Sequence, residues 1–184
     1  GLPVLRLPLL GRHQLHNAAV TLTIIETLRR RGWHIPDDAI RAGLAAVEWP
    51  GRFQVVRRAP IVVLDGGHNP QCMEALTQNV ADYLSGHPLT VLTGVLGDKD
   101  YAHMYGQLAT QAARFVTVTP HSPRALPAAD LSMILSTLGR PVTTCDTIAH
   151  GVDTALSLTQ PDGAVLCCGS LYLLGDVLDE LDRH

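Results

Sequence analysis

An apolar, β-branched run that stops abruptly in polar residues is the feature that most constrains this chain. Residues 61–64 read Ile-Val-Val-Leu, and they are followed by Asp65, two glycines, His68, an asparagine and Pro70. This run predicts a buried strand, and the glycines and proline predict a tight turn into a helix. Ligands of open α/β sheets bind outside the carboxyl ends of strands, so the turn is a candidate functional edge. The alternative is an ordinary turn in which Asn69 caps the helix.

A second polar loop follows a second apolar run, residues 89–93. It contains Lys99, which is the only lysine in the sequence and lies between two aspartates. An ammonium group at the carboxyl end of a strand could bind an anionic substrate or a phosphate, so Lys99 is a candidate site residue. The alternative is a solvated loop with a local ion pair.

A third candidate cation, Arg52, lies in the turn Trp49-Pro50-Gly51-Arg52-Phe53, before another expected strand. A guanidinium can grip phosphate oxygens through two parallel hydrogen bonds, which an ammonium cannot do. We therefore predict that Arg52 binds phosphate. The alternative is a turn arginine that covers Trp49.

Apolar periodicity alternates along the chain between segments typical of strands and segments typical of helices. This pattern predicts an α/β fold: a Rossmann-like, doubly wound, mostly parallel sheet with helices on both faces. The expected helices are residues 17–31, 37–47, 71–84, 102–113, 128–138, 148–158 and 171–181. The expected strands are residues 53–57, 61–64, 89–93, 115–119, a short one near Val142, and 164–168. The first two strands are predicted to form a hairpin, the one antiparallel contribution.

Composition and charge exclude several classes of protein. The net charge is −3 and the arginines are scattered, which argues against a nucleic-acid partner. No run approaches the roughly 20 apolar residues of a membrane span, so we expect no membrane partner. The cysteines Cys72, Cys145, Cys167 and Cys168 lack metal-site spacing, so we expect buried thiols in a reducing, cytoplasmic compartment.

Two histidines, His13 and His16, are spaced to share one helix face. Without a third ligand, this pair is weak evidence for a metal ion, and we predict no metal site in the chain.

The 184 residues are expected to be one part of a larger protein. The sequence does not begin with methionine, and residues 1–10, broken by two prolines, are typical of a linker from a preceding domain. A P-loop needs a lysine followed by serine or threonine, but Lys99 is followed by Asp100. The expected organisation is a linker over residues 1–10 and one domain over residues 11–184.

Five motifs resemble, in the same order, those of the carboxyl-terminal domain of the folylpolyglutamate synthase/dihydrofolate synthase family, within the Mur ligase superfamily. They are Gly11-x-His13-Gln14-x-x-Asn17-Ala18-Ala19, Pro50-Gly51-Arg52-Phe53, Asp65 to Pro70, Gly97-Asp98-Lys99-Asp100 and Gly169-Ser170-Leu171-Tyr172-Leu173. A sixth, weaker one is Pro123-Arg124-Ala125-Leu126, to which we assign no catalytic role. The resemblance covers nearly the whole chain. One departure is Gly67, where the family usually has alanine.

The resemblance implies an ATP-dependent amide ligase. In that family, ATP phosphorylates a carboxylate of folate or dihydropteroate, and the amino group of L-glutamate attacks the acyl phosphate. The P-loop and the Mg²⁺ ligands lie in an amino-terminal ATPase domain that is absent from this sequence. The present chain would therefore supply half of the active site and would not turn over alone.

The same resemblance implies roles on the nucleotide side of the site. Arg52 is expected to touch the ATP phosphates and to be catalytic, and Asn17 is expected to meet the adenine. Asp65 is expected to accept hydrogen bonds from the ribose or to hold Arg52. For Asn17, a helix N-cap or a buried helix position is the more ordinary alternative.

On the substrate side, His68, Lys99 and Ser170 are expected to contact glutamate or phosphate, and His68 and Lys99 are also expected to be catalytic. Ser170 could simply cap the helix that follows it. His68 could be a turn histidine that is bonded to the backbone.

Two other functions remain open at this point. One is another Mur-type ligase, which adds a different amino acid to a cell-wall precursor. The other is a non-catalytic module that binds nucleotide or glutamate. The combination of His68-Asn69-Pro70 with the Gly97 to Asp100 motif resembles the folate branch more, and a P-loop upstream would distinguish a ligase from a binding module.

Overall fold

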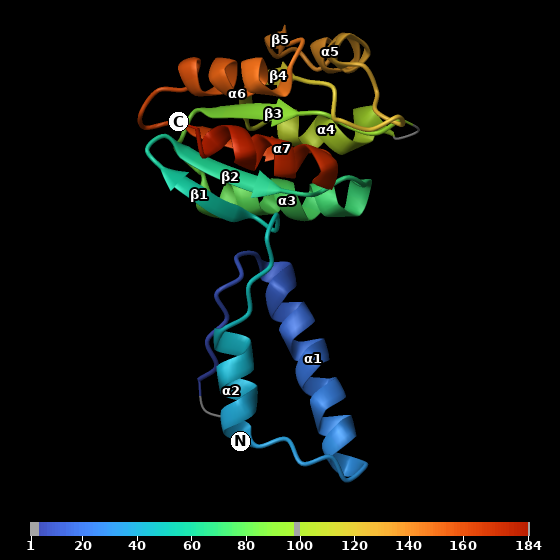
Figure 1. Cartoon of the computed structure of the whole chain (residues 1–184), viewed down its shortest axis with the longest axis vertical. Coiled ribbons are helices and arrows are strands. Elements are labelled where there is room, and N and C mark those ends of the chain that lie inside the picture. Colours follow the sequence, from blue (N-terminus) through green and yellow to red (C-terminus); the bar gives the residue numbers. More distant parts are fainter. Residues whose placement is uncertain (1–3, 98–99, 184) are drawn as a thin grey trace. The chain divides into compact units, whose positions relative to one another are not determined.

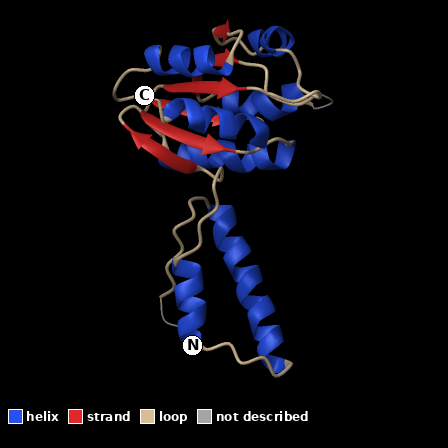
Figure 2. Ribbon diagram, viewed as in Figure 1, coloured by secondary structure: helices blue, strands red, loops and turns tan. Residues whose placement is uncertain are grey.

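The computed structural model describes residues 4–97 and 100–183, and the chain divides into two compact units (Figure 1, Figure 2). One unit is Gly1–Pro50 and the other is Gly51–His184. The division falls after Pro50 and not after residue 10 as expected. The residues before Pro50 form two helices, whereas the described strands all follow it.

The first unit contains α1 (Arg12–Arg30) and α2 (Asp37–Ala45). α1 begins earlier than the expected residue 17, directly after Gly11, whose φ of 108° cannot continue a helix. Arg29 of α1 binds the segment that leads into α2. Its Nε donates to the Ile35 carbonyl oxygen at 2.7 Å, and its Nη2 donates to the Asp37 carboxylate at 2.7 Å.

Few side chains of the first unit are buried. Among its described residues, only Gly11, Gln14 and Ile40 are buried. Large apolar side chains stay exposed on it: Leu15, Val20, Ile24, Trp33 and Trp49. A helix with apolar side chains on several faces is typical of a protein interior, so this unit has more apolar surface than its two helices can cover.

The second unit contains a six-stranded sheet in the order β1-β2-β6-β3-β4-β5. The strands are β1 (Gln54–Arg58), β2 (Ile61–Asp65), β3 (Leu89–Thr93), β4 (Ala112–Thr117), β5 (Val142–Thr144) and β6 (Ala164–Cys168). The predicted hairpin is confirmed, because β1 pairs antiparallel with β2. The other neighbours pair in parallel. Continuous Val, Leu and Ile runs suit the central strands, because both of their faces are covered.

Helices cover both faces of this sheet (Figure 1). They are α3 (Pro70–Tyr83), α4 (Tyr101–Ala109), α5 (Ala128–Ser136), α6 (Ile148–Ser157) and α7 (Leu171–Leu181). α3, α4 and α5 lie on one face, and α6 and α7 pack together on the other. A buried cluster that includes Leu64, Leu92 and Val177 joins α6 and α7 to the strands. The predicted doubly wound α/β fold is therefore confirmed.

In the second unit, element boundaries differ from the expected ones mainly around β4. α4 ends at Ala109 and not at residue 113, and β4 begins at Ala112 and not at residue 115. The reason is that Ala112 already pairs with Leu89 on the neighbouring strand. A parallel neighbour therefore extends the strand into a segment whose alanines are typical of a helix.

The cysteines are free thiols, and Cys145, Cys167 and Cys168 are buried as predicted, whereas Cys72 is half-buried. Burial raises the pKa of the Cys167 thiol to about 12. Burial, followed by the nearby Asp65 carboxylate, raises the pKa of Cys168 as well. Both thiols therefore stay neutral under ordinary conditions.

At about pH 8, iodoacetamide should modify Cys72 in the folded chain and leave Cys167 and Cys168 unmodified, because the thiolate is the reactive species. Mass spectrometry after alkylation in buffer and in urea measures the difference, and in urea every cysteine should react. Equal rates for Cys72 and Cys167 in buffer would contradict the burial described above.

Candidate functional site

The carboxyl ends of three central strands finish at the same level. Asp65 of β2 and Thr93 of β3 both pair with Cys168 of β6, which lies between them. The chain leaves β2 and β3 toward helices on one face, and it leaves β6 toward α7 on the other face. Such a reversal opens a crevice between neighbouring loops, and α/β sheets bind ligands in this crevice.

A cavity of about 250 Å³ lies at this edge of the sheet. Three loops line it, with His68 after β2, Leu96 after β3 and Arg124 after β4, and residues 169–172 at the start of α7 complete it. Cavities for drug-sized ligands measure about 300–1,000 Å³, so this one suits a ligand of amino-acid size.

His68 is oriented by its own turn. Its Nδ1 lies 2.9 Å from the carbonyl oxygen of Gly66. Because a carbonyl oxygen can only accept a hydrogen bond, Nδ1 carries the proton and Nε2 is left as an acceptor in the neutral ring. The alternative role, a turn histidine bonded to backbone, is therefore observed. That role leaves Nε2 available to a ligand.

Two helices begin at this edge with side-chain caps. Asn69 accepts a hydrogen bond from the amide of Cys72 at 2.9 Å, ahead of α3. Ser170 accepts one from the amide of Tyr172 at 3.2 Å, ahead of α7. Both caps are ordinary alternatives that the sequence left open, and both are observed. The start of α7 lines the cavity, so the partial positive charge of its N-terminus favours an anionic ligand there.

Arg124 lines the cavity on a loop that is fastened to the loop after β3. The amide of Gly97 donates to the Arg124 carbonyl oxygen at 2.6 Å, and the amide of Leu126 donates to the Val95 carbonyl oxygen at 2.9 Å. The two loops also form a short antiparallel bridge. Sequence reasoning missed this residue as a site candidate. The available signal was an arginine beside a proline, shortly after a buried strand.

Asp65 is buried, and its carboxylate joins two turns. Oδ1 accepts a hydrogen bond from the Gly67 amide at 2.7 Å, and Oδ2 accepts one from the Phe53 amide at 2.9 Å. Arg52 precedes Phe53 in the first of these turns and is half-buried. Two backbone amides thus bind this carboxylate, which acts on the Arg52 turn through Phe53.

The two glycines after Asp65 have a different role from the expected one, because neither Gly66 nor Gly67 has a positive φ. At Gly66, a side chain would displace the side chain of Leu171. A Cβ at this position would lie 2.2 Å from Cδ2 of Leu171.

Gly169 has the conformation that only glycine adopts easily, with a φ of +106°. A Cβ there would lie 2.7 Å from Thr93 Oγ1 and 2.8 Å from both the Gly94 carbonyl oxygen and the Tyr105 hydroxyl. Thr93 Oγ1 donates to the Cys168 carbonyl oxygen at 2.9 Å and accepts from the Tyr105 hydroxyl. Burial raises the pKa of Tyr105, so its hydroxyl remains a donor. These buried groups pack against Gly169, which lines the cavity.

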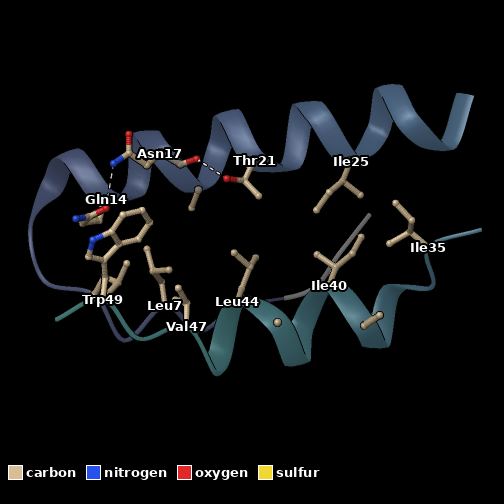
Figure 3. Close-up of a pocket in the computed structure, with 14 residues that line it drawn as sticks. Leu7, Gln14, Asn17, Thr21, Ile25, Ile35, Ile40, Leu44, Val47 and Trp49 are labelled. Atoms are coloured by element: carbon tan, nitrogen blue, oxygen red, sulfur yellow. Dashed lines mark hydrogen bonds between the residues drawn. The ribbon is translucent and has the colours of Figure 1, made fainter. Parts of the chain in front are cut away.

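In the first unit, Asn17 lines an apolar cavity of about 530 Å³ between α1 and α2 (Figure 3). Its Nδ2 donates to Gln14 Oε1 at 3.0 Å. Figure 3 shows Gln14, Asn17 and Trp49 together at one end of the cavity, whereas isoleucines surround the other end. Asn17 lies inside α1 and is exposed, so both ordinary alternatives, an N-cap and a buried position, are wrong.

Lys99 lies outside the described residues, so its role stays a prediction. The structure brings two of the predicted residues, His68 and Ser170, around one cavity together with Arg124. Within residues 4–97 and 100–183, no group of three or more His, Cys, Asp or Glu is placed to hold a metal ion. In that same part of the chain, no helix combines the length and apolar character that a membrane crossing needs.

The family described as Mur ligase, glutamate ligase domain, matches residues 51–171. The chain belongs to this Mur ligase family. The Mur ligase chain is 33% identical over 179 residues to a folylpolyglutamate synthase of Lacticaseibacillus casei, a match that covers 96% of the chain and 40% of that protein. It is 36% identical over 162 residues to a dihydrofolate synthase/folylpolyglutamate synthase of Mycobacterium tuberculosis, covering 86% and 33%.

Solved structures resemble the Mur ligase chain closely. Mycobacterium tuberculosis folylpolyglutamate synthase complexed with ADP matches with a TM-score of 0.90 at 31% identity, over 100% of this chain and 43% of that one. A bifunctional folylpolyglutamate synthase/dihydrofolate synthase with Mn, AMPPNP and L-glutamate bound matches with a TM-score of 0.82 at 28% identity, over 99% and 41%. The Mur ligase chain thus spans less than half the length of these relatives.

Proposed function

We propose that this chain is the carboxyl-terminal part of an ATP-dependent ligase that adds L-glutamate to folate, to dihydropteroate, or to both. The observation that carries the proposal is the cavity at the centre of the sheet edge, lined by Arg124, His68 and the N-terminus of α7. The two carboxylates of glutamate suit the guanidinium and the helix N-terminus, and its amino group suits Nε2 of His68. The names of the relatives support the same activity.

The proposed reaction has two steps. ATP phosphorylates a carboxylate of the pteroate or folate acceptor, and the amino group of glutamate then attacks the acyl phosphate to form an amide and release phosphate. Glutamate enters with a protonated amino group, which must lose a proton before it can attack. His68 is the proposed acceptor of that proton, because its Nδ1 is bonded to Gly66 and its Nε2 is the basic atom.

On the nucleotide side, Arg52 is the proposed ligand of the transferred phosphate, because cations placed on the migrating charge are a main source of catalysis in phosphoryl transfer. Asn17 is the proposed contact of the adenine. A nucleotide with a divalent metal ion is proposed for this chain because relatives were solved with ADP and with AMPPNP and Mn. Mg²⁺ is the ion we expect, held by the amino-terminal ATPase domain.

That amino-terminal domain is itself a proposal, supported by the first unit. α1 has exposed apolar residues, and an apolar cavity lies between α1 and α2. The first unit does not supply enough polypeptide to cover both. The chain spans less than half the length of its relatives, which also supports a further domain in the longer protein. The free cysteines support the expected cytoplasmic location.

Lys99 is proposed to contact a carboxylate of glutamate, since it is the only lysine and follows a central strand. Lys99→Ala in the longer enzyme should raise the KM for glutamate about ten-fold and leave the KM for ATP within about two-fold. Steady-state kinetics with each substrate varied in turn provides the measurement. An unchanged dependence on glutamate would remove Lys99 from the glutamate site.

Another Mur-type amino-acid ligase is the second candidate function. It is supported by a 26% identical relative in Brucella melitensis, named UDP-N-acetylmuramoyl-L-alanyl-D-glutamate--2,6-diaminopimelate ligase. The folate relatives are more similar, which favours the first candidate.

The test is ADP release by the longer enzyme with dihydropteroate, tetrahydrofolate or a cell-wall precursor, each with and without glutamate. Release that requires a pteroate or folate together with glutamate would support the proposed ligase and identify its acceptor. Release with the cell-wall precursor alone would support the second candidate. No release with any pair would leave a non-catalytic binding module.

A further inference from the structure

The turn that carries Arg52 is fastened to the end of β2 at two points. The amide of Gly66 donates to the carbonyl oxygen of Gly51 at 2.8 Å, and the amide of Phe53 donates to Asp65 Oδ2 at 2.9 Å. The residues on both sides of Arg52 are therefore held by the turn that follows β2. The division between the two units falls just before Gly51, so the Arg52 turn belongs to the sheet.

Phe53 has a backbone conformation in this turn that is unfavourable for the residue by itself. Its φ is 42°, a left-handed conformation that is unfavourable for a bulky residue. Such a conformation persists only where the surroundings determine it. Here the ring is buried and lies 5.7 Å from the ring of Tyr83, and the amide is bound by Asp65.

The second carboxylate oxygen of Asp65 holds the other turn. Oδ1 accepts from the amide of Gly67, directly before His68, and His68 is bonded to Gly66 in the same turn. One buried carboxylate thus sets the distance between the turn of Arg52 and the turn of His68. A neutral amide cannot replace it, because the NH₂ group of asparagine donates and would face one of the two N–H groups.

We propose that Asp65 is a positioning residue that clamps the phosphate-binding Arg52 and the glutamate-binding His68 at a fixed separation. This inference rests on the proposed function, in which Arg52 acts on the phosphoryl group and His68 on the amine that attacks beside it. A clamp between them aligns the two groups before the substrates bind, and alignment of this kind contributes to rate more than to affinity. Asp65 acts through these residues and not through a bond to the reacting atoms.

A double-mutant cycle in the longer enzyme tests this role. Asp65→Asn should lower kcat about five-fold and leave the KM for glutamate within about two-fold, because the contacts to glutamate stay in place. In the Arg52→Ala background, the same change should lower kcat less than about two-fold, since there is no guanidinium left to position. Equal losses in both backgrounds would overturn the proposal.

Two further variants separate positioning from loss of stability. Asp65→Glu keeps the charge but displaces the carboxylate by one methylene, and it should reproduce both the loss of kcat and its disappearance in the Arg52→Ala background. Thr147→Ala removes one side-chain bond to a backbone amide, the cap of α6, away from the cavity. It should leave kcat unchanged. A similar loss of kcat in Thr147→Ala would assign the Asp65 effect to stability and overturn the proposal.

Amide hydrogen exchange of the longer enzyme tests the clamp without any substrate. In Asp65→Asn, at least one of the amides of Phe53 and Gly67 should exchange at least about ten-fold faster, while the amides of β6 keep their rates. Unchanged protection of both amides would overturn the clamp, whatever the kinetics. A wild-type enzyme without ligase activity, combined with the expected exchange, would overturn the proposed function and leave the clamp standing.

Discussion

Replacing Gly169 with alanine is expected to lower the free energy of unfolding of the second unit by about 2–5 kcal/mol. About 1–2 kcal/mol comes from placing a side chain at a positive φ. About 1–3 kcal/mol more comes from forcing a methyl group into a filled space. The groups it meets cannot move aside easily, because one is the backbone carbonyl of Gly94 and the other two, on Thr93 and Tyr105, are hydrogen-bonded to each other.

Urea unfolding followed by circular dichroism measures this change, and Gly175→Ala is the matched control. Gly175 lies inside α7, and a Cβ there would meet nothing within 4 Å. Alanine is favoured over glycine in a helix interior, so the control should gain about 0.5–1 kcal/mol. If the two variants change the stability by similar amounts, the packing described beneath the cavity is wrong.

The second large effect is expected at Arg52. Arg52→Ala in the longer enzyme should reduce turnover at least about ten-fold, because it removes a cation from the migrating phosphoryl group. Folding should be preserved, since the turn is held by the backbone of Gly51 and by the amide and ring of Phe53.

Arg58→Ala is the control for charge, because Arg58 is exposed at the opposite end of β1. Its turnover should match that of the wild type, and both variants should unfold near the wild-type temperature. Near-normal turnover of Arg52→Ala would exclude Arg52 from the mechanism.

Local signals in the sequence were sufficient for much of this fold. β3 and β6 have the expected bounds because both strands are buried throughout and consist mainly of apolar or β-branched residues, a pattern typical of a central strand. The caps at Asn69 and Ser170 were equally accessible, since each precedes an apolar helical repeat. The end of α4 was harder to place, because the alanines after it are typical of a helix and only pairing with β3 makes them a strand.

Features that depend on long-range contacts could not be predicted. No local signal indicates that β6 lies between β2 and β3, and the cavity exists only because of that order. The position of Arg124 depends on a bridge between two loops. The partners of Asp65 depend on the conformation of Phe53, which is unfavourable for that residue on its own. The division after Pro50 likewise follows from packing, which composition does not reveal.

The central place of β6 has a consequence for synthesis on the ribosome. Among the described strands β6 comes last, and its partners β2 and β3 are made long before it. Until residues 164–168 emerge, the nascent chain exposes two apolar strand edges that can pair with other chains. The functional edge of the sheet therefore forms only after β6 has been made, and the growing chain needs protection from aggregation until then.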